Sequence, residues 1–547
     1  MLQRNYPYYP HEKLETLSEL LDYGCEKYGK KTVFSFHQGE KIIRKSFIDY
    51  AKDVRNLSSY FYKNYKKKHI AVCGENSYEW LVTFMAIVIS GNVCVPIDRD
   101  ADAPLLKKLL RAADCDTLFY SEKYLPFVKD LSLKAEFKAE PLENTSEKIT
   151  LGQKLQESIP QATKTHTANQ KSQTTKYYTP HQVKKDDLAV IFFTSGTTGA
   201  NKGVCLSENN IMSDIYGASS IYIPGGNTVN VLPFHHSFGL VTAILMPEYY
   251  GCETYICSSL KYFTKAMQLI HPETIFVVPA FIEAFYRQIW KTARKEHMDK
   301  KLKAALSVTS GLKHIGLDFR RTVAKKILNE FGGELKHIIC GGAYLDPFYV
   351  KWFRKIGIEV LNGYGITECS PVLSVNRNNY HKDGTIGIPC RGAEIKIIDG
   401  EICAKGEMVM LGYYENGKIL PPGDYFHTGD FGFIDSDGFV HITGRLKNTI
   451  ILSNGENVSP ETIESELLKD KGVREAVVYG ENGGISAVIF PEEDRIGDEI
   501  YFENLRKRYN YNRPASRKLA KISLRTTEFV KNSSQKIIRS KIMEKNQ

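Results

Sequence analysis

The feature that most constrains this chain is an apolar strand pattern that ends in a loop of small and hydroxylated residues. Leu188–Phe193 is a run of six apolar residues, which is typical of a buried strand. The ten residues TSGTTGANKG, Thr194–Gly203, follow it directly. Small residues let backbone N–H groups approach phosphate oxygens, while hydroxyl groups and one lysine add charge-assisted hydrogen bonds. The pattern predicts a polyphosphate loop, but not a Walker A loop, because neither Gly before Lys202 nor Ser or Thr after it is present.

Strand-like and helix-like patterns alternate on both sides of this loop. Such alternation predicts an α/β fold with mostly parallel sheets and covering helices. The strand-like runs are His69–Cys73, Thr274–Val278, His337–Ile339 and Glu359–Leu361, and the helix-like segments are Leu17–Tyr28, Trp80–Ile89 and Phe319–Phe331.

The length of 547 residues predicts more than one domain. We expect a large, multi-lobed N-terminal domain over residues 1–444, in which about 139–187 form a polar surface connection. Beyond Gly444 the pattern restarts as a small, mobile α+β domain over residues 445–547. Its expected elements are a hairpin from Thr449–Leu452 through the turn Asn454-Gly455, a helix Pro460–Leu468 with Ser459 as N-cap, and strands Ala476–Tyr479 and Ile485–Phe490.

The composition indicates the cellular compartment and the classes of partner that we expect. Lys and Arg outnumber Asp and Glu by 73 to 63, but they are spread along the chain, which argues against a nucleic-acid partner. Eleven cysteines without a Cys-x-x-Cys pair favour reduced thiols in the cytoplasm. The apolar stretch Trp80–Ile97 is interrupted by Ser90-Gly91-Asn92, so we expect at most a peripheral contact with a membrane.

The decapeptide and several motifs that follow it in order resemble the adenylate-forming superfamily, which includes acyl- and aryl-CoA synthetases, luciferases and peptide synthetase adenylation domains. The resemblance extends from about Glu15 to Ser540 and is closest to fatty acyl-CoA ligases. It implies that ATP and Mg²⁺ activate a carboxylic acid as an acyl-AMP, and that the acyl group then passes to a thiol, with CoA as the acceptor substrate.

The resemblance also implies a nucleotide site. In Gly363-Tyr364-Gly365-Ile366-Thr367-Glu368, Tyr364 would stack on adenine, Thr367 would contact the α-phosphate and Glu368 would hold the metal. In Thr428-Gly429-Asp430, Asp430 would accept the ribose hydroxyls with help from Arg445. The implied nucleotide-binding set is Thr194, Ser195, Gly196, Thr197, Thr198, Gly199, Lys202, Gly342, Ala343, Tyr344, Gly363, Tyr364, Gly365, Thr367, Asp430, Arg445 and Lys536.

Near the C-terminus, Ser533–Arg539 resembles the loop that delivers a catalytic lysine. Lys536 would stabilise the charge that develops at the α-phosphorus. Lys447 matches the hinge of the small domain, and the turn Ser453, Asn454, Gly455 resembles the one that lines the thiol tunnel. The chain departs from the family pattern at Gln535 and Tyr344, where Gly and Pro are usual.

Leu232–Gly239, LPFHHSFG, resembles the Pro-x-x-His-x-x-Gly motif, which would place His236 beside the acyl carboxylate and make it catalytic together with Thr367 and Lys536. Leu232–Pro247 contains no Asp or Glu to pair with a substrate ammonium, so an amino-acid substrate is disfavoured. The pocket segments Phe276–Phe281, Gly341–Leu345 and Ile366–Val372 are largely apolar and aromatic, which favours a fatty or aryl tail. We expect a medium- or long-chain fatty acid. The implied acyl-pocket residues are His236, Phe238, Gly341, Gly342 and Gly365.

Three alternatives stay open beside the fatty acyl-CoA ligase. The acid could be aryl, because the pocket segments are aromatic as well as apolar. The acceptor could be a free acyl carrier protein, because the sequence does not distinguish the two thiols. The departures at Gln535 and Tyr344 leave a non-catalytic nucleotide-binding regulator as a third hypothesis.

Overall fold

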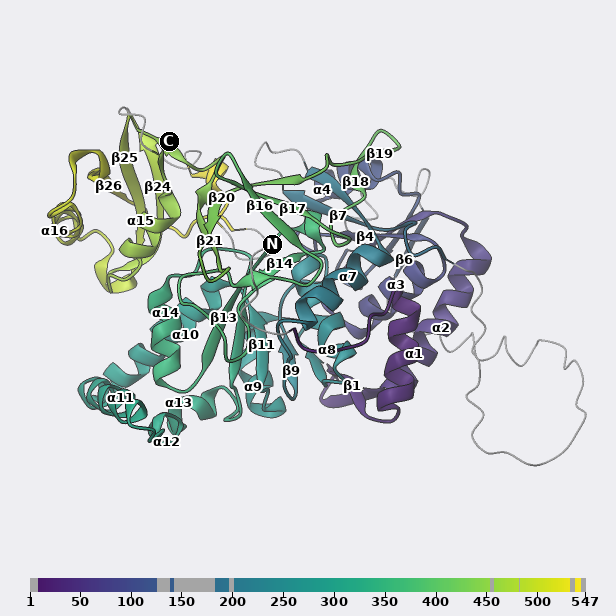
Figure 1. Ribbon diagram of the computed structural model, residues 1–547, viewed down its shortest axis with the longest axis horizontal. Coiled ribbons are helices and arrows are strands. Elements are labelled where there is room, and N and C mark those ends of the chain that lie inside the picture. Colours follow the sequence, from purple (N-terminus) through teal and green to yellow (C-terminus); the bar gives the residue numbers. More distant parts are fainter. Residues whose placement is uncertain are drawn as a thin grey trace, which may run out of the picture.

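The computed structural model describes residues 8–124, 138–141, 183–195, 201–452, 457–481, 483–531 and 537–542 (Figure 1). Two large sheets form the body of the molecule, and a smaller sheet and the C-terminal elements lie at one side of them (Figure 1). No helix in these ranges is both long enough and apolar enough to cross a membrane.

The first large sheet has nine strands in the described residues. They are β1 (Thr32–Gln38), β2 (Lys41–Ser46), β9 (Thr228–Asn230), β10 (Thr254–Ile256), β11 (Thr274–Val277), β12 (His337–Cys340), β13 (Glu359–Gly365), β14 (Val372–Val375) and β15 (Ile388–Pro389). Their order is β15-β14-β13-β12-β11-β9-β10-β1-β2. The strands from β13 to β1 in this order run parallel, and β14, β15 and β2 join antiparallel at the two edges. The parallel centre is apolar, as expected for strands covered on both faces.

The second large sheet carries the predicted phosphate loop. Its strands are β3 (His69–Cys73), β4 (Val93–Ile97), β5 (Thr117–Tyr120), β6 (Lys138–Pro141), β7 (Leu188–Ser195), β8 (Asn201–Ser207), β18 (Gly412–Glu415) and β19 (Lys418–Leu420). They are ordered β19-β18-β8-β7-β4-β3-β5-β6, parallel from β7 to β6 and antiparallel from β7 to β19. The prediction of mostly parallel sheets is therefore confirmed.

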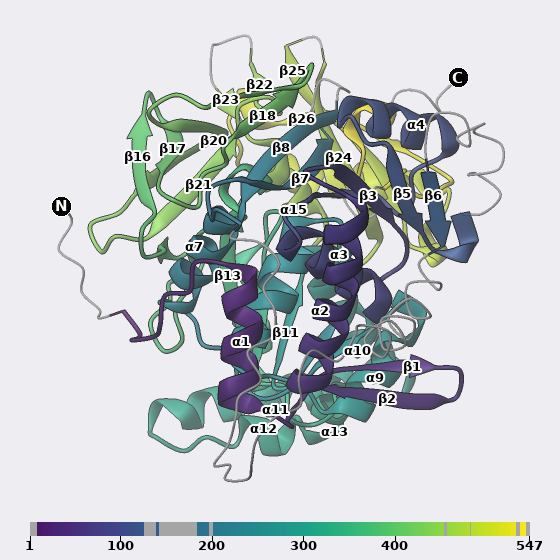
Figure 2. The ribbon, with the colours of Figure 1, turned by 90° about the vertical axis from the view of Figure 1, so that its right-hand side faces the viewer.

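Helices cover both sheets and fill the space between them (Figure 2). In the N-terminal part they are α1 (Leu17–Tyr28), α2 (Phe47–Asn64), α3 (Tyr78–Ile89), α4 (Ala103–Ala112), α7 (Glu208–Ser219) and α8 (Met246–Tyr249). Next come α9 (Phe263–Ile270), α10 (Pro279–Lys295), α11 (Asp299–His314), α12 (Arg320–Val323), α13 (Lys325–Glu330) and α14 (Pro347–Lys355). Helix α3 is apolar all round and nearly every residue of it is buried, which is the pattern of a core helix rather than a surface one.

The helix expected over Phe319–Phe331 is divided in the structure. Ala324 has φ −86° and ψ 7°, which lies outside the helical region and separates α12 from α13. The continuous helical prediction was therefore wrong at this position.

An antiparallel sheet of four strands precedes the C-terminal elements. It consists of β16 (Glu394–Ile398), β17 (Glu401–Lys405), β20 (Phe426–Ile434) and β21 (Val440–Arg445), in that order. The sequence patterns did not predict this sheet, although it supplies two of the predicted site residues, Asp430 and Arg445, from adjacent strands.

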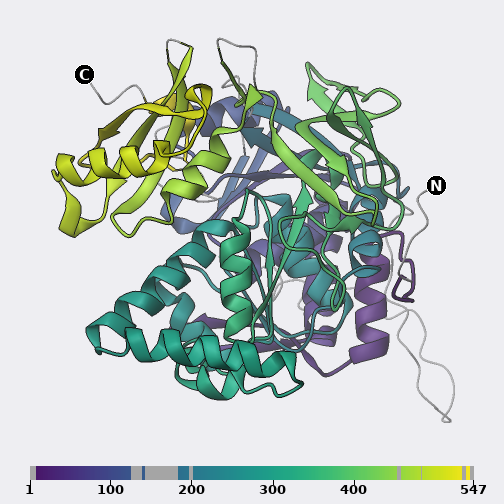
Figure 3. The same cartoon turned by 60° about the vertical axis from the view of Figure 1, so that its left-hand side comes forward.

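The elements after Arg445 have a hydrophobic cluster of their own and extend from the rest of the molecule (Figure 3). They are β22 (Ile450–Ile451), β23 (Asn457–Val458), α15 (Pro460–Leu467), β24 (Val473–Glu481), β25 (Gly484–Pro491), α16 (Glu499–Asn510) and β26 (Leu519–Leu524). The expected hairpin exists as the antiparallel pair β22 and β23. Ser459 lies at the N-cap position of α15, but its side chain makes no capping hydrogen bond; its hydroxyl donates to Glu461 Oε2 at 2.8 Å.

Candidate active site

The predicted phosphate loop connects two antiparallel strands. Thr194 at the end of β7 pairs in register with Lys202 of β8, so the chain turns back on itself between them. Lys202 is exposed, and its ammonium lies 4.4 Å from the centre of the Tyr413 ring on β18. The loop residues Gly196, Thr197, Thr198 and Gly199, and the side chain of Ser195, lie outside the described residues.

The segment from Gly363 to Gly365 forms the end of β13, where the chain turns toward β14. Gly363 lies against the backbone of β14, and Gly365 allows an even closer approach, because a Cβ atom there would lie 1.9 Å from the carbonyl oxygen of Pro371. Tyr364 between them is 8% exposed, and its hydroxyl donates a 2.7 Å hydrogen bond to Oδ2 of Asp430. Burial, followed by the nearby Asp430 charge, raises the pKa of Tyr364, so the phenol stays protonated and acts as the donor.

Asp430 is held by residues of β13 and β21 and by Thr428 of its own strand, β20. Its Oδ1 accepts from Arg445 Nε at 3.0 Å, its Oδ2 accepts from Tyr364, and its backbone N–H donates to Thr428 Oγ1 at 3.2 Å. Asp430 is only 6% exposed, and its two side-chain partners fix the orientation of the carboxylate. The preceding residue, Gly429, donates its N–H to Glu401 Oε1 at 2.7 Å, which anchors the backbone next to the carboxylate.

Thr367 and Glu368 lie in the short 3₁₀ turn Thr367–Cys369 that follows β13. Ser237 Oγ lies 3.3 Å from Thr367 Oγ1 and donates to it. The Tyr413 hydroxyl donates to Glu368 Oε1 at 2.9 Å. Tyr413 thus contacts both Lys202 and Glu368, and a hard carboxylate oxygen beside a hydroxyl fits Mg²⁺, which favours one or two carboxylates together with substrate phosphates.

The histidine motif occupies a tightly folded loop between β9 and a π-helical segment, Phe238–Leu245. Asn76 holds the loop by donating to the Leu232 carbonyl at 2.8 Å and accepting from the Phe234 N–H at 3.1 Å. His236 is half-buried, and the centre of its ring lies 4.3 Å from that of His235.

Asp98, His235, Asp214 and Tyr413 of this site were not assigned from the sequence. Asp98 follows β4, and its Oδ1 lies 3.2 Å from Nε2 of the buried His235. Asp214 of α7 is fully buried and accepts the Val372 N–H at 2.7 Å, close to the turn that carries Thr367. A carboxylate directly after the apolar run Val93–Ile97 was the signal for Asp98, while Tyr413 and Asp214 lie in segments without a recognisable pattern.

Phe238 and Gly341 form one contact of the predicted acyl pocket. A Cβ atom on Gly341 would lie 3.2 Å from Cζ of Phe238, so the ring rests directly on the glycine. Gly342 has φ +85°, a left-handed conformation that favours glycine, and Val278 lies beside it. Ala343 and Tyr344 are exposed, with Tyr344 at 44%.

The remaining predicted residues belong to the C-terminal part of the chain. Lys447 is exposed and lies just after β21, where the chain leaves the four-stranded sheet. Lys536 and the turn Ser453, Asn454, Gly455 lie outside the described residues. The segment that contains Lys536 is bounded by an antiparallel bridge between Lys531 and Ile537, and Arg539 nearby makes an ion pair of 2.6 Å with Glu464.

Comparison with known families finds two consecutive matches. The AMP-binding enzyme family matches residues 21–414, and the AMP-binding enzyme C-terminal domain matches residues 447–546. The first match covers well over half of the chain, which is sufficient to show the family.

Individual relatives have low sequence identity to this chain but match most of its length. A long-chain-fatty-acid–CoA ligase, FadD15 of Mycobacterium bovis, is 27% identical over 438 residues, which are 75% of this chain and 71% of that protein. A chloroplastic long-chain-fatty-acid–acyl-carrier-protein ligase, AEE15 of Arabidopsis thaliana, is 26% identical over 577 residues, with 88% and 77% covered.

Solved structures of the same fold include complexes with adenylates and ATP. The anthranilate CoA ligase AuaEII in complex with anthranoyl-AMP has a TM-score of 0.75 at 18% identity, with 98% of this chain and 97% of that chain covered. ATP-bound MatB from Rhodopseudomonas palustris has a TM-score of 0.71 at 20% identity, with 96% and 98% covered. Together with the family match, these findings confirm the resemblance stated from the motifs: the chain belongs to the AMP-binding enzyme family, within the adenylate-forming superfamily.

Proposed function

We propose that this protein activates a carboxylic acid with ATP as an acyl-AMP and transfers the acyl group to a thiol. The preferred substrates are a medium- or long-chain fatty acid and CoA. The observation that carries the proposal is that Tyr364 and Arg445, from separate strands, both contact the buried carboxylate of Asp430. An aromatic ring beside a fixed carboxylate provides a stacking surface for a base and an acceptor for ribose hydroxyls.

The phosphate end of ATP would lie toward Thr194 and Lys202. Thr367 would contact the α-phosphate, with its hydroxyl oriented by Ser237. Mg²⁺, when bound at Glu368, would neutralise phosphate charge. Tyr413 would position both Glu368 and Lys202, because its hydroxyl and its ring contact one each.

In the first step the carboxylate of the acid attacks the α-phosphorus and pyrophosphate leaves. Negative charge accumulates at the α-phosphate in the transition state, and the Lys536 ammonium would stabilise it. His236 would lie beside the carboxylate, and His235 with Asp98 would hold the position of that loop. Phe238, Gly341, Gly342 and Gly365 would shape the space for the acyl chain.

In the second step the thiol attacks the acyl carbon and AMP leaves. We propose that residues 445–547 form a separate domain that turns about Lys447, so that the Lys536 segment gives way to the turn Ser453, Asn454, Gly455 along the thiol's route. Relatives named as CoA ligases support CoA as acceptor, whereas the relative named as an acyl-carrier-protein ligase supports a carrier protein as the second candidate.

The proposal is tested by incubating the protein with ATP, Mg²⁺ and free acids from acetate to palmitate plus benzoate, with and without CoA. We expect acid-dependent pyrophosphate release for one class of acid, and AMP release that requires CoA. Lys536→Ala should abolish pyrophosphate release, whereas Lys541→Ala, an exposed lysine on the same segment, should not. Pyrophosphate without a CoA effect would point to a carrier protein, and nucleotide binding without either product would replace the proposal with a regulatory role.

A further inference from the structure

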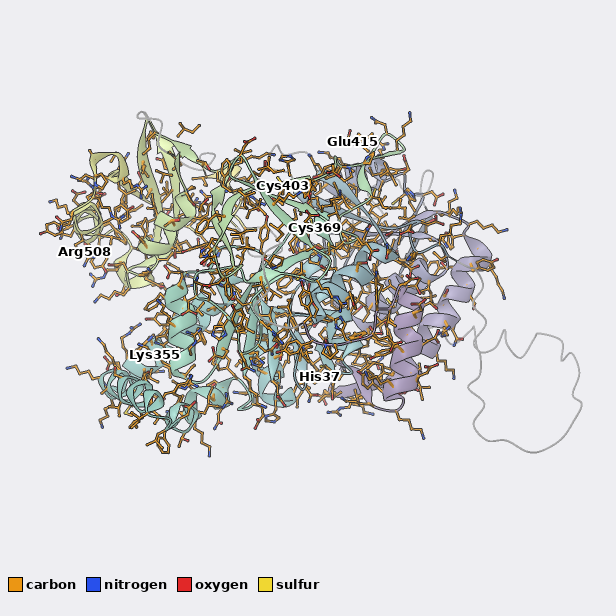
Figure 4. All side chains as sticks on the ribbon, in the orientation of Figure 1. His37, Lys355, Cys369, Cys403, Glu415 and Arg508 are labelled. Atoms are coloured by element: carbon orange, nitrogen blue, oxygen red, sulfur yellow. The ribbon has the colours of Figure 1, made fainter. Side chains whose placement is uncertain are left out.

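Three side chains with metal-binding atoms meet on one face of the four-stranded sheet. Glu401 and Cys403 are two residues apart on β17, so they point to the same side. His427 on β20 is the direct cross-strand partner of Cys403. Neighbouring strands therefore bring a carboxylate, a thiol and an imidazole together, at the position where Cys403 is labelled in Figure 4.

The distances between these atoms are close to those of a coordination site. Nδ1 of His427 lies 3.4 Å from Sγ of Cys403 and 2.7 Å from Oε2 of Glu401, and all three ligand atoms lie within 4.8 Å of one another. Around a tetrahedral Zn²⁺, sulfur and nitrogen or oxygen ligands are separated by about 3.3–3.6 Å, given bond lengths of about 2.0–2.3 Å. To surround such a cation, the 2.7 Å separation must lengthen and the widest must shorten to about 3.6 Å, which side-chain rotations can provide.

The site is also reachable from solvent. The His427 side chain is 57% exposed and lines an open cavity of about 560 Å³ together with Tyr425, Pro422 and Tyr413. Cys403, in contrast, is fully buried. A cation would therefore enter beside the exposed imidazole, reach the buried sulfur from the His427 side, and keep water at the fourth position.

We propose that Glu401, Cys403 and His427 form a binding site for a soft divalent transition cation, Zn²⁺ being the natural occupant. On binding, the Cys403 thiol loses its proton to water and the thiolate sulfur binds the cation. The Nδ1 lone pair of His427 and Oε2 of Glu401 supply the other two ligands. Mg²⁺ does not suit this set of ligands, because it favours oxygen donors, whereas thiolate and imidazole favour Zn²⁺. The site is therefore separate in its chemistry from the Mg²⁺ site proposed at Glu368.

The second oxygen of Glu401 connects this site to the backbone beside Asp430, the ribose-binding residue of the proposed function. Oε1 accepts the Gly429 N–H at 2.7 Å, and Gly429 directly precedes Asp430. A cation on Oε2 would fix the carboxylate that anchors this backbone. Occupancy of the site thus acts on the segment that presents the ribose-binding group.

The test uses Co²⁺ as a spectroscopic probe on the full chain. We expect one equivalent of Co²⁺ to produce a thiolate-to-cobalt charge-transfer band in the near ultraviolet and the visible bands of a tetrahedral ion. Cys403→Ser should remove the charge-transfer band, and His427→Asn should weaken binding at least about tenfold. Zn²⁺ should displace Co²⁺ and erase both sets of bands.

Two controls match these variants. Cys257→Ser replaces another buried cysteine, whose Sγ contacts the Ser259 carbonyl at 3.1 Å, a hydrogen bond that serine can keep. His297→Asn replaces an exposed histidine with φ +57°, a conformation that asparagine tolerates. Both controls should bind Co²⁺ like the unmodified protein. A charge-transfer band that is absent in the unmodified protein, or that persists in Cys403→Ser, would overturn the proposal.

Thermal unfolding gives a second readout in case Cys403→Ser folds poorly. Because Zn²⁺ binds the folded state, its addition should raise the Tm of the unmodified protein and of His297→Asn by a few degrees. His427→Asn, a change at a largely exposed side chain, should fold normally and show no such rise. An equal rise in His427→Asn would contradict the assignment of the ligands.

Discussion

The hydroxyl of Tyr364 donates a 2.7 Å hydrogen bond to Oδ2 of Asp430, 66 positions later in the chain. Tyr364 belongs to the nine-stranded sheet and Asp430 to the antiparallel four-stranded sheet. This single contact therefore joins two sheets at the proposed base and ribose sites, and it connects the orientation of the ring to that of the carboxylate.

Tyr364→Phe tests this connection. The variant keeps an aromatic ring but removes the donor to Asp430, which retains Arg445 as a partner. A hydrogen bond to a charged group contributes about 1.5–3 kcal/mol, so we expect KM for ATP to rise about tenfold or more, with a smaller effect on kcat. Pyrophosphate release at varied ATP concentration measures both constants. An unchanged KM would show that the hydroxyl does not position the nucleotide.

Tyr413→Phe separates metal positioning from metal binding. Loss of its hydroxyl frees Glu368 Oε1 while keeping the ring beneath Lys202. We expect a higher Mg²⁺ concentration for half-maximal rate and little change in the maximal rate, whereas Glu368→Gln should lower the maximal rate about a hundredfold or more because the charged ligand itself is lost. Tyr414→Phe, on the same strand but bonded to Asp114, is the control. Equal Mg²⁺ dependence in Tyr413→Phe and the unmodified protein would contradict this role.

Phe238 and Gly341 should control the size of the accepted acid. Phe238→Ala removes the ring that rests on Gly341, so we expect kcat/KM to shift toward longer or bulkier acids. A methylene in an apolar pocket changes the transition-state energy by about 1–3 kcal/mol, which corresponds to about tenfold or more per added group. Gly341→Val should act in the opposite direction, because its side chain would meet the ring. The acid panel measures both ratios; parallel loss for all acids would point to general disruption of the loop instead.

Glu248 should make stability depend on pH. Both of its carboxylate oxygens are buried without a hydrogen-bond partner among the described residues, and burial raises the pKa of this carboxyl to about 8. The folded state therefore holds the proton more tightly than the unfolded state, so this group lowers the free energy of unfolding as pH rises from about 4.5 to about 8, by on the order of 4 kcal/mol.

Glu248→Gln removes that titration. We expect its Tm to be close to that of the unmodified protein at pH 5 and several degrees higher at pH 8. Glu415→Gln, at an exposed position of β18, should follow the unmodified protein at both pH values. If the Tm difference between Glu248→Gln and the unmodified protein is the same at both pH values, the Glu248 carboxyl is not a buried group that stays protonated.

Apolar runs and turn chemistry predicted the parallel strands and the buried helix well. Leu188–Phe193, His69–Cys73 and His337–Ile339 became β7, β3 and β12, because runs of this kind are stable only when both faces are covered. The four-stranded sheet was not predicted, since strands such as Glu394–Ile398 alternate between exposed and half-buried residues and resemble loops. Its register depends on distant partners that no local pattern contains.

The candidate site divides in the same way. Tyr364, Glu368 and Asp430 stand in compact motifs, so their identity could be stated from the sequence. The partners of these residues could not be predicted. Tyr413 lies 45 positions from Glu368 in the sequence, and the pairing of β18 with β8 brings the two side chains together. The contact between Asp98 and His235, which come from different elements, could not be predicted for the same reason.

The Asp346 carboxylate connects α14 to the C-terminal elements after Arg445. Its Oδ1 accepts the Phe348 N–H at 2.7 Å and caps α14, while its Oδ2 meets Ser465 Oγ at 2.9 Å and Lys469 Nζ at 2.8 Å, both from the α15 region. Turning the C-terminal elements away would break the contacts of Oδ2 and leave the cap intact. Because one of those contacts is an ion pair with a 41% exposed lysine, dissolved salt weakens it selectively. If the C-terminal elements turn between the two half-reactions as proposed, we expect ionic strength to change how readily the first is followed by the second.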